Sequence, residues 1–130
     1  MTYIKLDDVS ENHLLGVWKV KHRLTNSTNA AQLFARCDCV KFSDKKVFTT
    51  IAQDGKRKKG TWNIIRETEM IYNPQVKFKL PKKELINSII TNLMTVDESH
   101  SKLILYFDSG LELVLEKDHE IRNCRRTKLK

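Results

Sequence analysis

The chain has 130 residues and a mass of 15.2 kDa, which is enough for one domain with an ordinary core and too little for two. Its 24 lysines and arginines outnumber its 16 acidic residues and give a formal net charge of +8 at pH 7. The absence of a run of about 18 apolar residues excludes a membrane-spanning helix, and the N-terminus lacks the pattern of a signal peptide.

The positive charge is concentrated in two places. One is the run Lys56–Lys59, and the other is the C-terminal stretch 121–130, which carries five cations and no acid. Because these nine cations exceed the whole surplus of eight, the rest of the chain is close to neutral. We therefore expect a folded domain over residues 1–120 and a basic tail over 121–130. A solvated turn and tail would explain this distribution, and an anionic partner is the alternative.

The first elements expected along the chain are a short helix over Ser10–Leu15, with Ser10 as its N-cap, and a strand over Leu15–Leu24. Apolar and basic residues alternate along this strand, which is typical of a strand with one buried face. Four residues share its predicted inward face: Trp18, Val20, His22 and Leu24. The segment Asn26–Arg36 breaks the alternation, and we expect a loop or a short helix there.

Turn signals then separate a series of short strands. Asp54-Gly55 and Asp108-Ser109-Gly110 predict tight hairpins because glycine tolerates the positive φ that such turns require, and Asp97–Ser101 predicts a third hairpin loop. Pro81–Met94 fits both a helical stripe and an extended chain; we predict a loop or one helical turn to about Asn87, followed by a strand. The remaining strands are expected at Cys39–Ser43, Lys46–Gln53, Lys56–Ile65, Glu69–Asn73, Val76–Leu80, Ile89–Val96, Lys102–Phe107 and Leu111–Lys117.

A short helix followed by eight or nine strands with short connections predicts an all-β domain. The expected architecture is a single antiparallel up-and-down β-barrel of about eight strands, with a β-sandwich as the alternative. In such a barrel, Asn26–Arg36 would lie across one mouth as a lid.

Both tryptophans follow a glycine by two residues, in Gly16-Val17-Trp18 and Gly60-Thr61-Trp62. Within a strand, glycine marks a bulge, a corner or a close approach of another part of the chain. The tryptophan two residues later points to the same face, so its ring lies beside the missing side chain. The repeated pattern predicts two strand corners, each with a tryptophan in the core.

A G-x-W after a short helix, at the start of the first strand, resembles the lipocalin signature. The resemblance implies an eight-stranded barrel closed at its floor by Trp18. It also implies a basic residue packed over that ring, for which Arg122 and Lys117 are the candidates. Such domains are typically exported or lipid-anchored, and this chain shows no export signal. Ordered motifs over residues 12–117 are similar to the small bacterial lipocalin-like domains: Leu15–Trp18, Val40–Phe42, Asp44–Thr49, Gly60–Ile64, Ile90–Thr95 and Lys102–Phe107.

Three cysteines cannot all pair within one chain. Cys37 and Cys39 are two residues apart, so in a regular strand they would point to the same face and would not bond to each other. No C-x-x-C pair suited to zinc occurs. The sequence leaves open either three buried or half-buried thiols or one bridge to Cys124 from Cys37 or Cys39.

The sequence shows no pattern that would assemble an active site. His13, His22, His100 and His119 fall on different elements without a metal-binding spacing, and no nucleophile elbow, P-loop or dinucleotide fingerprint occurs. We therefore expect no enzymatic activity, no catalytic residue, no metal and no cofactor. His22 is the one titratable residue expected to face inward, either as a hydrogen-bonded core residue or as a polar contact to a ligand.

A barrel of about eight strands is just wide enough to be filled by its own side chains or to hold one small ligand. We expect a non-enzymatic binding protein for a small hydrophobic or amphipathic molecule, monomeric or weakly homo-oligomeric. The residues expected to contact the ligand are Trp18, Val20, His22, Phe42, Phe48, Trp62, Ile64, Tyr72, Phe107 and Leu113.

Two other functions stay open. Lys56–Lys59 and the basic tail favour binding to nucleic acid or another anionic surface, although inward-facing tryptophans leave few aromatic side chains for base stacking. A barrel filled by its own side chains would instead be a scaffold that binds another protein. The expected compartment is the periplasm or the exterior if a signal has been removed, and the cytoplasm otherwise.

Overall fold

The structure is a computed structural model that describes residues 2–25, 32–66 and 73–119. Within this part of the chain, two short α-helices lie at α1 (Glu11–Leu14) and α2 (Gln32–Arg36), and three 3-10 turns lie at Leu6–Asp8, Asp44–Lys46 and Pro81–Lys83. The strands are β1 (Thr2–Tyr3), β2 (Gly16–Thr25), β3 (Cys37–Ser43), β4 (Val47–Ala52), β5 (Arg57–Ile65), β6 (Gln75–Lys79), β7 (Leu85–Thr95), β8 (His100–Phe107) and β9 (Leu111–Asp118).

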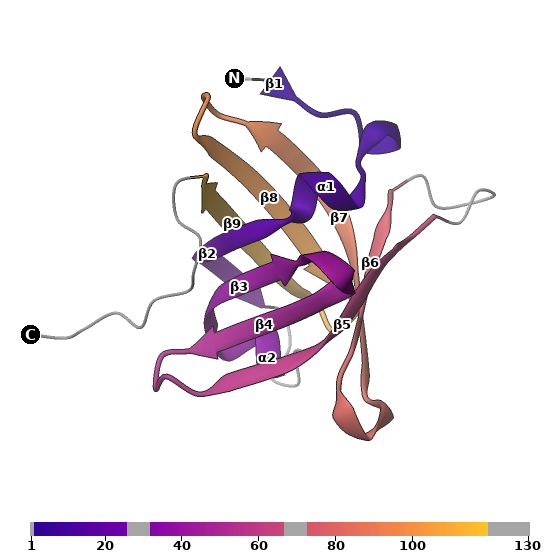
Figure 1. Ribbon diagram of the computed structural model, residues 1–130, viewed down its shortest axis with the longest axis vertical. Coiled ribbons are helices and arrows are strands. Elements are labelled where there is room, and N and C mark those ends of the chain that lie inside the picture. Colours follow the sequence, from indigo (N-terminus) through magenta and orange to yellow (C-terminus); the bar gives the residue numbers. More distant parts are fainter. Residues whose placement is uncertain (1, 26–31, 67–72, 120–130) are drawn as a thin grey trace, which may run out of the picture.

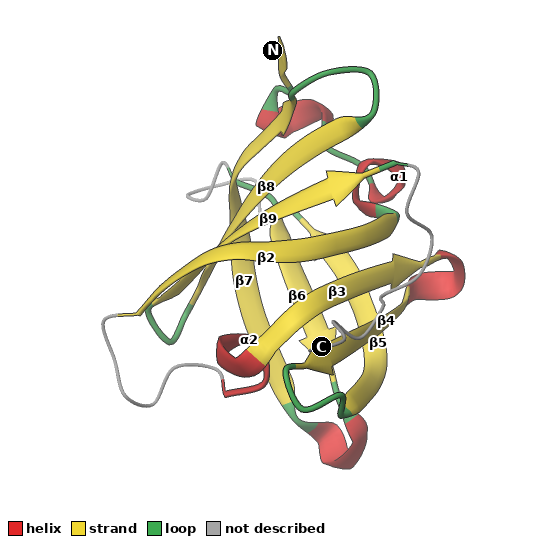
Figure 2. Cartoon of the chain, turned by 90° about the vertical axis from the view of Figure 1, so that its left-hand side faces the viewer, coloured by secondary structure: helices red, strands yellow, loops and turns green. Residues whose placement is uncertain are grey.

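The strands β2 to β9 form one closed antiparallel barrel. Each of them pairs with the next along the chain, and β9 returns to pair with β2, so the ring of hydrogen bonds is complete. The short strand β1 adds to the end of β7 beyond β6. Figures 1 and 2 show the strands curving around a common interior, with α1 at one end and α2 at the other. The predicted all-β, eight-stranded up-and-down barrel with a short N-terminal helix is confirmed.

One segment differs from the sequence-based prediction, and two predicted segments lie wholly or mostly outside the described residues. The strand β7 begins at Leu85, directly after the turn Pro81–Lys83, whereas the prediction placed a loop to about Asn87. Pairing of Leu85–Ile89 with β6 outweighs the weak local preference of this segment. Most of the predicted strand Glu69–Asn73 and the predicted tail 121–130 lie outside the described residues.

A bulge in β2 overturns the predicted inward orientation of His22. Val20 lies opposite the buried Leu115, whereas His22 lies opposite Val114 and Arg23 opposite the buried Leu113. The extra residue, Lys21, places two successive side chains on the outer face. His22 is therefore exposed on the outside, Arg23 takes the inward position, and Leu24, also predicted inward, is 63% exposed.

A second bulge separates the neighbouring cysteines. Cys37 lies opposite Ala52 and Cys39 opposite Ile51, with Asp38 as the extra residue. Cys37 packs in the interior cluster, whereas Cys39 packs with Val17 and Ile51 in a small cluster on the outer face, so the prediction of one shared face is wrong. Cys37 is a free thiol and Cys39 is disulfide-bonded. Cys124 lies outside the described residues.

The first G-x-W builds the floor of the barrel. The ring of Trp18 is fully buried, and its Nε1 donates a hydrogen bond to the Leu14 carbonyl at 2.8 Å. Lys117 lies with Nζ 4.9 Å from the centre of this ring and donates to the Leu15 carbonyl at 2.9 Å, so it is a basic residue packed over the tryptophan. The other candidate, Arg122, lies outside the described residues. Burial lowers the pKa of Lys117. Gly16 has a φ of +126°, and a Cβ there would lie 2.8 Å from Lys117 Cδ.

The second G-x-W permits a close approach between strands. Trp62 is buried, donates from Nε1 to the Val47 carbonyl at 3.2 Å, and meets the ring of Phe42 edge-on at 4.9 Å. A Cβ on Gly60 would collide with the backbone oxygen of Lys79 and would lie 2.7 Å from Cε1 of Phe48. The missing side chain lets β6 and the Phe48 ring pack against β5.

Gly60→Ala should therefore destabilise the fold, because the obstructing atom belongs to the backbone and cannot swing away. We expect the free energy of unfolding, measured by urea denaturation, to fall by about 3 kcal/mol. The neighbouring exposed substitution Thr61→Ala should cost less than about 1 kcal/mol. Equal losses for the two variants would show that Gly60 is not needed for this packing.

Candidate functional site

The residues predicted to contact a ligand divide into four groups. Val20 and Ile64 are partly buried against the interior cluster, His22 lies on the outer face, and Tyr72 lies outside the described residues. The remaining six are buried in the interior: Trp18, Phe42, Phe48, Trp62, Phe107 and Leu113.

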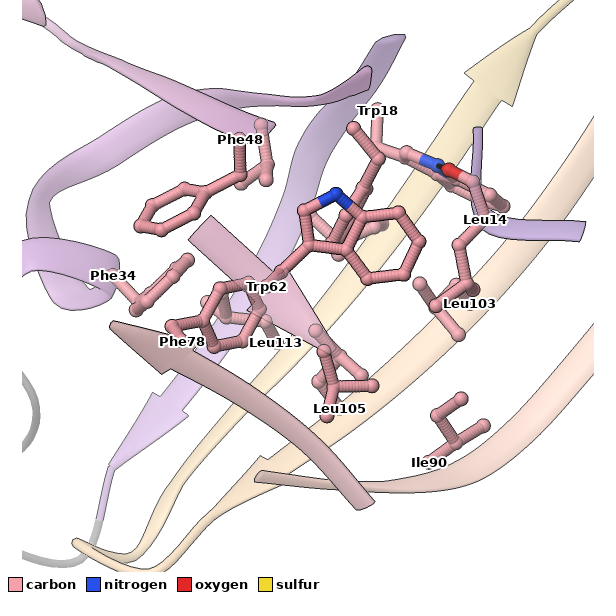
Figure 3. Close-up of a cluster of buried hydrophobic side chains, with 14 of the residues drawn as sticks. Leu14, Trp18, Phe34, Phe48, Trp62, Phe78, Ile90, Leu103, Leu105 and Leu113 are labelled. Carbon is pink, nitrogen blue, oxygen red and sulfur yellow. Dashed lines mark hydrogen bonds between the residues drawn. The ribbon is translucent and has the colours of Figure 1, made fainter. Parts of the chain in front are cut away.

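A phenylalanine from α2 completes the interior at the end opposite Trp18. Phe34 is fully buried, with its ring centre 4.5 Å from that of Phe78, 4.8 Å from Phe107 and 6.1 Å from Phe48. Figure 3 shows Phe34 pointing toward Phe48 and Phe78 across the barrel. The sequence indicated a cover from Asn26–Arg36 but not this contact. The signal was the pair Leu33-Phe34, the bulkiest apolar side chains of that segment.

Arg23 holds α2 in place. Its guanidinium donates to the Ala35 carbonyl at 2.7 Å and to the Cys37 carbonyl at 2.8 Å, and it lies 3.2 Å from Oδ1 of Asp38. The last carbonyls of a helix have no partner within the helix, and a cation there also opposes the negative end of the helix dipole. A helix of five residues does not form by itself in water, so α2 depends on Arg23 and on the burial of Phe34.

The described interior is almost wholly apolar, except near the end that α2 covers. Thr50 and Ser88 are each 1% exposed, and the Ser88 hydroxyl donates to the Val76 carbonyl at 3.0 Å. Lys58 lies opposite Thr50 and therefore points to the inner side of the sheet, but it is exposed because it stands near the end of β5. Arg23 and Lys58 thus bring two cations to the inner side of the barrel at the end that α2 covers.

The free thiol of Cys37 lies directly beneath α2. Its Sγ is 3.5 Å from the Phe34 carbonyl, to which it donates, and burial raises the pKa of the thiol to about 12. A thiol in this environment stays protonated and unreactive while α2 is in place.

A second cluster of functional side chains lies on the outer face, near the β7–β8 loop. His100 Nδ1 is 3.0 Å from Oδ1 of Asp97, and His100 Nε2 is 3.6 Å from Oδ2 of Asp118. Hydrogen bonds to the Ser99 backbone and to His100 hold the pKa of Asp97 at about 2, and the bond to Asp97 raises the pKa of His100. His100 and Asp118, but not Asp97, line a shallow hollow of about 170 Å³, together with Val17, Lys19, Lys21 and Glu116.

This outer cluster could not be foreseen, because a loop and the end of a distant strand bring its members together. On His100, Asp97 and the Ser99 hydroxyl both lie at Nδ1, so among the described residues no hydroxyl is poised on its opposite nitrogen as a nucleophile. The described part of the chain also contains no group of three metal-ligating side chains.

Comparisons with protein-family models, with curated proteins and with solved structures found no match to this chain. Among the described helices, none is long and apolar enough to cross a membrane.

The Asp97–His100 pair should stabilise the fold within a limited pH window. Because the pKa of Asp97 is lowered, its contribution is present above pH 3.8 and lost as the pH falls toward about 2. Because the pKa of His100 is raised, its contribution is present below pH 6.5 and lost as the pH rises past the folded value. Asp97→Asn should therefore lower stability most near pH 5, and should lower the pKa of His100 measured by NMR.

The matched control for this experiment is Glu98→Gln, which removes a neighbouring exposed carboxylate. It should leave the titration of His100 in place. An unchanged His100 titration in Asp97→Asn would contradict the pairing.

Proposed function

We propose that the chain is a non-enzymatic binding protein for a small apolar or amphipathic molecule, held in the barrel interior. The observation that carries the proposal is the difference between the two ends of the barrel. One end is closed by Trp18 and Lys117, which belong to paired strands, whereas the other is covered by the short helix α2 with Phe34 inserted. A cover of five residues can be displaced without breaking the sheet.

In this proposal, Phe34 occupies the place of the ligand when no ligand is bound. The side chains around it are the surroundings that an apolar ligand would meet: Phe48, Phe78 and Phe107. Moving a fully buried phenylalanine into water costs about 1.5–3 kcal/mol, which a ligand must recover from its own burial. The ligand is therefore a molecule with a substantial apolar body.

The charges at the covered end specify the other part of the ligand. Arg23 and Lys58 lie on the inner side of the barrel at this end, and Asp38 is the acid bound to Arg23. An amphipathic molecule with an anionic or strongly hydrogen-bonding head group would place that group here and its apolar body inward. The resemblance to lipocalins and the position of Lys117 over Trp18 support the same function.

The first test is fluorescence titration with N-phenyl-1-naphthylamine, an apolar probe. The native chain should bind the probe saturably at one site, and Phe34→Ala should bind it about tenfold to a hundredfold more tightly, because no phenylalanine must be displaced. Tyr106→Ala, which removes an aromatic ring that is 40% exposed on the outside, should leave the affinity unchanged.

Two results would contradict the proposal. Absence of saturable binding in both the native chain and a folded Phe34→Ala variant would favour a filled scaffold. An equal change of affinity in Tyr106→Ala would place the probe on the outer surface. A cooperative urea transition establishes that each variant is folded.

The second test uses Cys37 as a reporter of the position of α2. At pH 8 under non-reducing conditions, iodoacetamide should modify Cys37 slowly, because the thiol is buried and its pKa is about 12. Arg23→Gln removes the guanidinium from the end of α2 and should accelerate modification about tenfold or more, since hydrogen bonds to a charged group contribute about 1.5–3 kcal/mol. The control Lys19→Gln changes an exposed residue on the same strand and should not accelerate the modification of Cys37. Equal modification rates in the two variants would contradict the role of Arg23.

A further inference from the structure

The outer face of β5 and β6 gathers cations that are separated in the sequence. Trp62, Val76 and Phe78 point into the core, so the residues that alternate with them point outward. Lys79 lies opposite Thr61, and Lys77 lies opposite Asn63. Further along β5 the outward positions are Lys59 and Arg57. We define the β5–β6 basic face as Arg57, Lys59, Thr61, Asn63, Lys77 and Lys79.

Among the described residues, no carboxylate stands on this face. The outward positions of β4, β5 and β6 hold no aspartate or glutamate, and the four cations of the face form no ion pair within the described residues. By contrast, the outer face of β9 carries Glu112 and Glu116. The charge is therefore directional, and the predicted basic run Lys56–Lys59 is part of a surface that extends over two strands.

The spacing and chemistry of the face suit a polymer of phosphates. Outward residues lie about 6.8 Å apart along a strand and about 7–8 Å apart on the diagonal between neighbouring strands. Thr61 and Asn63 stand between the lysines and are exposed. The Asn63 Oδ1 accepts from Lys46 at 3.2 Å, which directs its amide group away from that lysine and leaves the N–H donors for a ligand. Lysine, arginine, threonine and asparagine are the side chains that proteins use to hold phosphate oxygens.

We propose that the β5–β6 basic face binds the phosphate backbone of double-stranded nucleic acid without regard to sequence. The face carries no tryptophan, tyrosine or phenylalanine, so the bases of a single strand have no ring on which to stack. A duplex keeps its bases paired and presents closely spaced phosphates instead. The interaction uses the outside of the barrel and is independent of a ligand in the interior.

The test is fluorescence anisotropy with a fluorescein-labelled duplex DNA of about 16 base pairs, titrated with the full chain at several salt concentrations. Two unrelated sequences should bind equally, and the double substitution Lys59→Gln with Lys79→Gln should weaken binding at least tenfold at low salt. Losing two phosphate contacts should also reduce the slope of log K against log salt by about two. This difference separates the face from any contribution of residues 121–130, which all variants share.

The matched control is Lys5→Gln with Lys102→Gln, which removes two cations from outside the face. It should keep most of the affinity, whereas an equal loss in both double variants would show an effect of net charge alone and overturn the proposal. Three other results would also overturn the proposal. They are absence of duplex binding at low salt, tighter binding to a single strand of the same length, and preferential binding to phosphatidylserine vesicles. Naphthylamine binding should be the same in all variants, so this proposal and that for the interior can fail separately.

Discussion

The arrangement at the covered end depends on the extra residue in β2. The strand pairs with β3 through its first half and with β9 through most of its length, and the bulge at Lys21 falls within the β9 pairing. Because the bulge shifts the alternation by one residue, Arg23 rather than His22 points inward. From this position its guanidinium reaches the carbonyls of Ala35 and Cys37, just after Phe34. A regular strand would have placed an imidazole inside and left α2 without its anchor.

The two ends of the barrel are consequently closed by interactions of different strength. At the floor, Trp18 and Lys117 belong to strands that are hydrogen-bonded on both sides, so opening this end would require breaking the sheet. At the other end, the cover is one short helix that leads into β3 and is held by Arg23, by the buried Phe34 and by the partly buried Leu33 and Ala35. Local opening free energies follow such differences in packing and hydrogen bonding. A ligand of the proposed kind would therefore enter at the covered end.

The barrel could be predicted from the sequence because the period-two pattern and the glycine turns each repeat several times, so single errors did not change the architecture. The orientation of single residues could not be predicted, because a bulge leaves no reliable pattern in the sequence. The bulges at Lys21 and Asp38 reversed the expectations for His22 and for the two cysteines. The Asp97–His100 pair was invisible for another reason: its geometry arises from the folding of a loop and not from periodicity.

The close packing of the interior is compatible with a binding function because of where each aromatic ring comes from. An empty apolar cavity lowers stability in proportion to its volume, so a binding protein without its ligand benefits from a side chain that fills the space. Phe42, Phe48, Phe78 and Phe107 come from strands and are fixed by the ladder of the sheet. Of the described phenylalanines in the interior, Phe34 alone comes from an element outside the sheet. Its withdrawal would expose a ready-made aromatic surface while every strand pairing stayed intact.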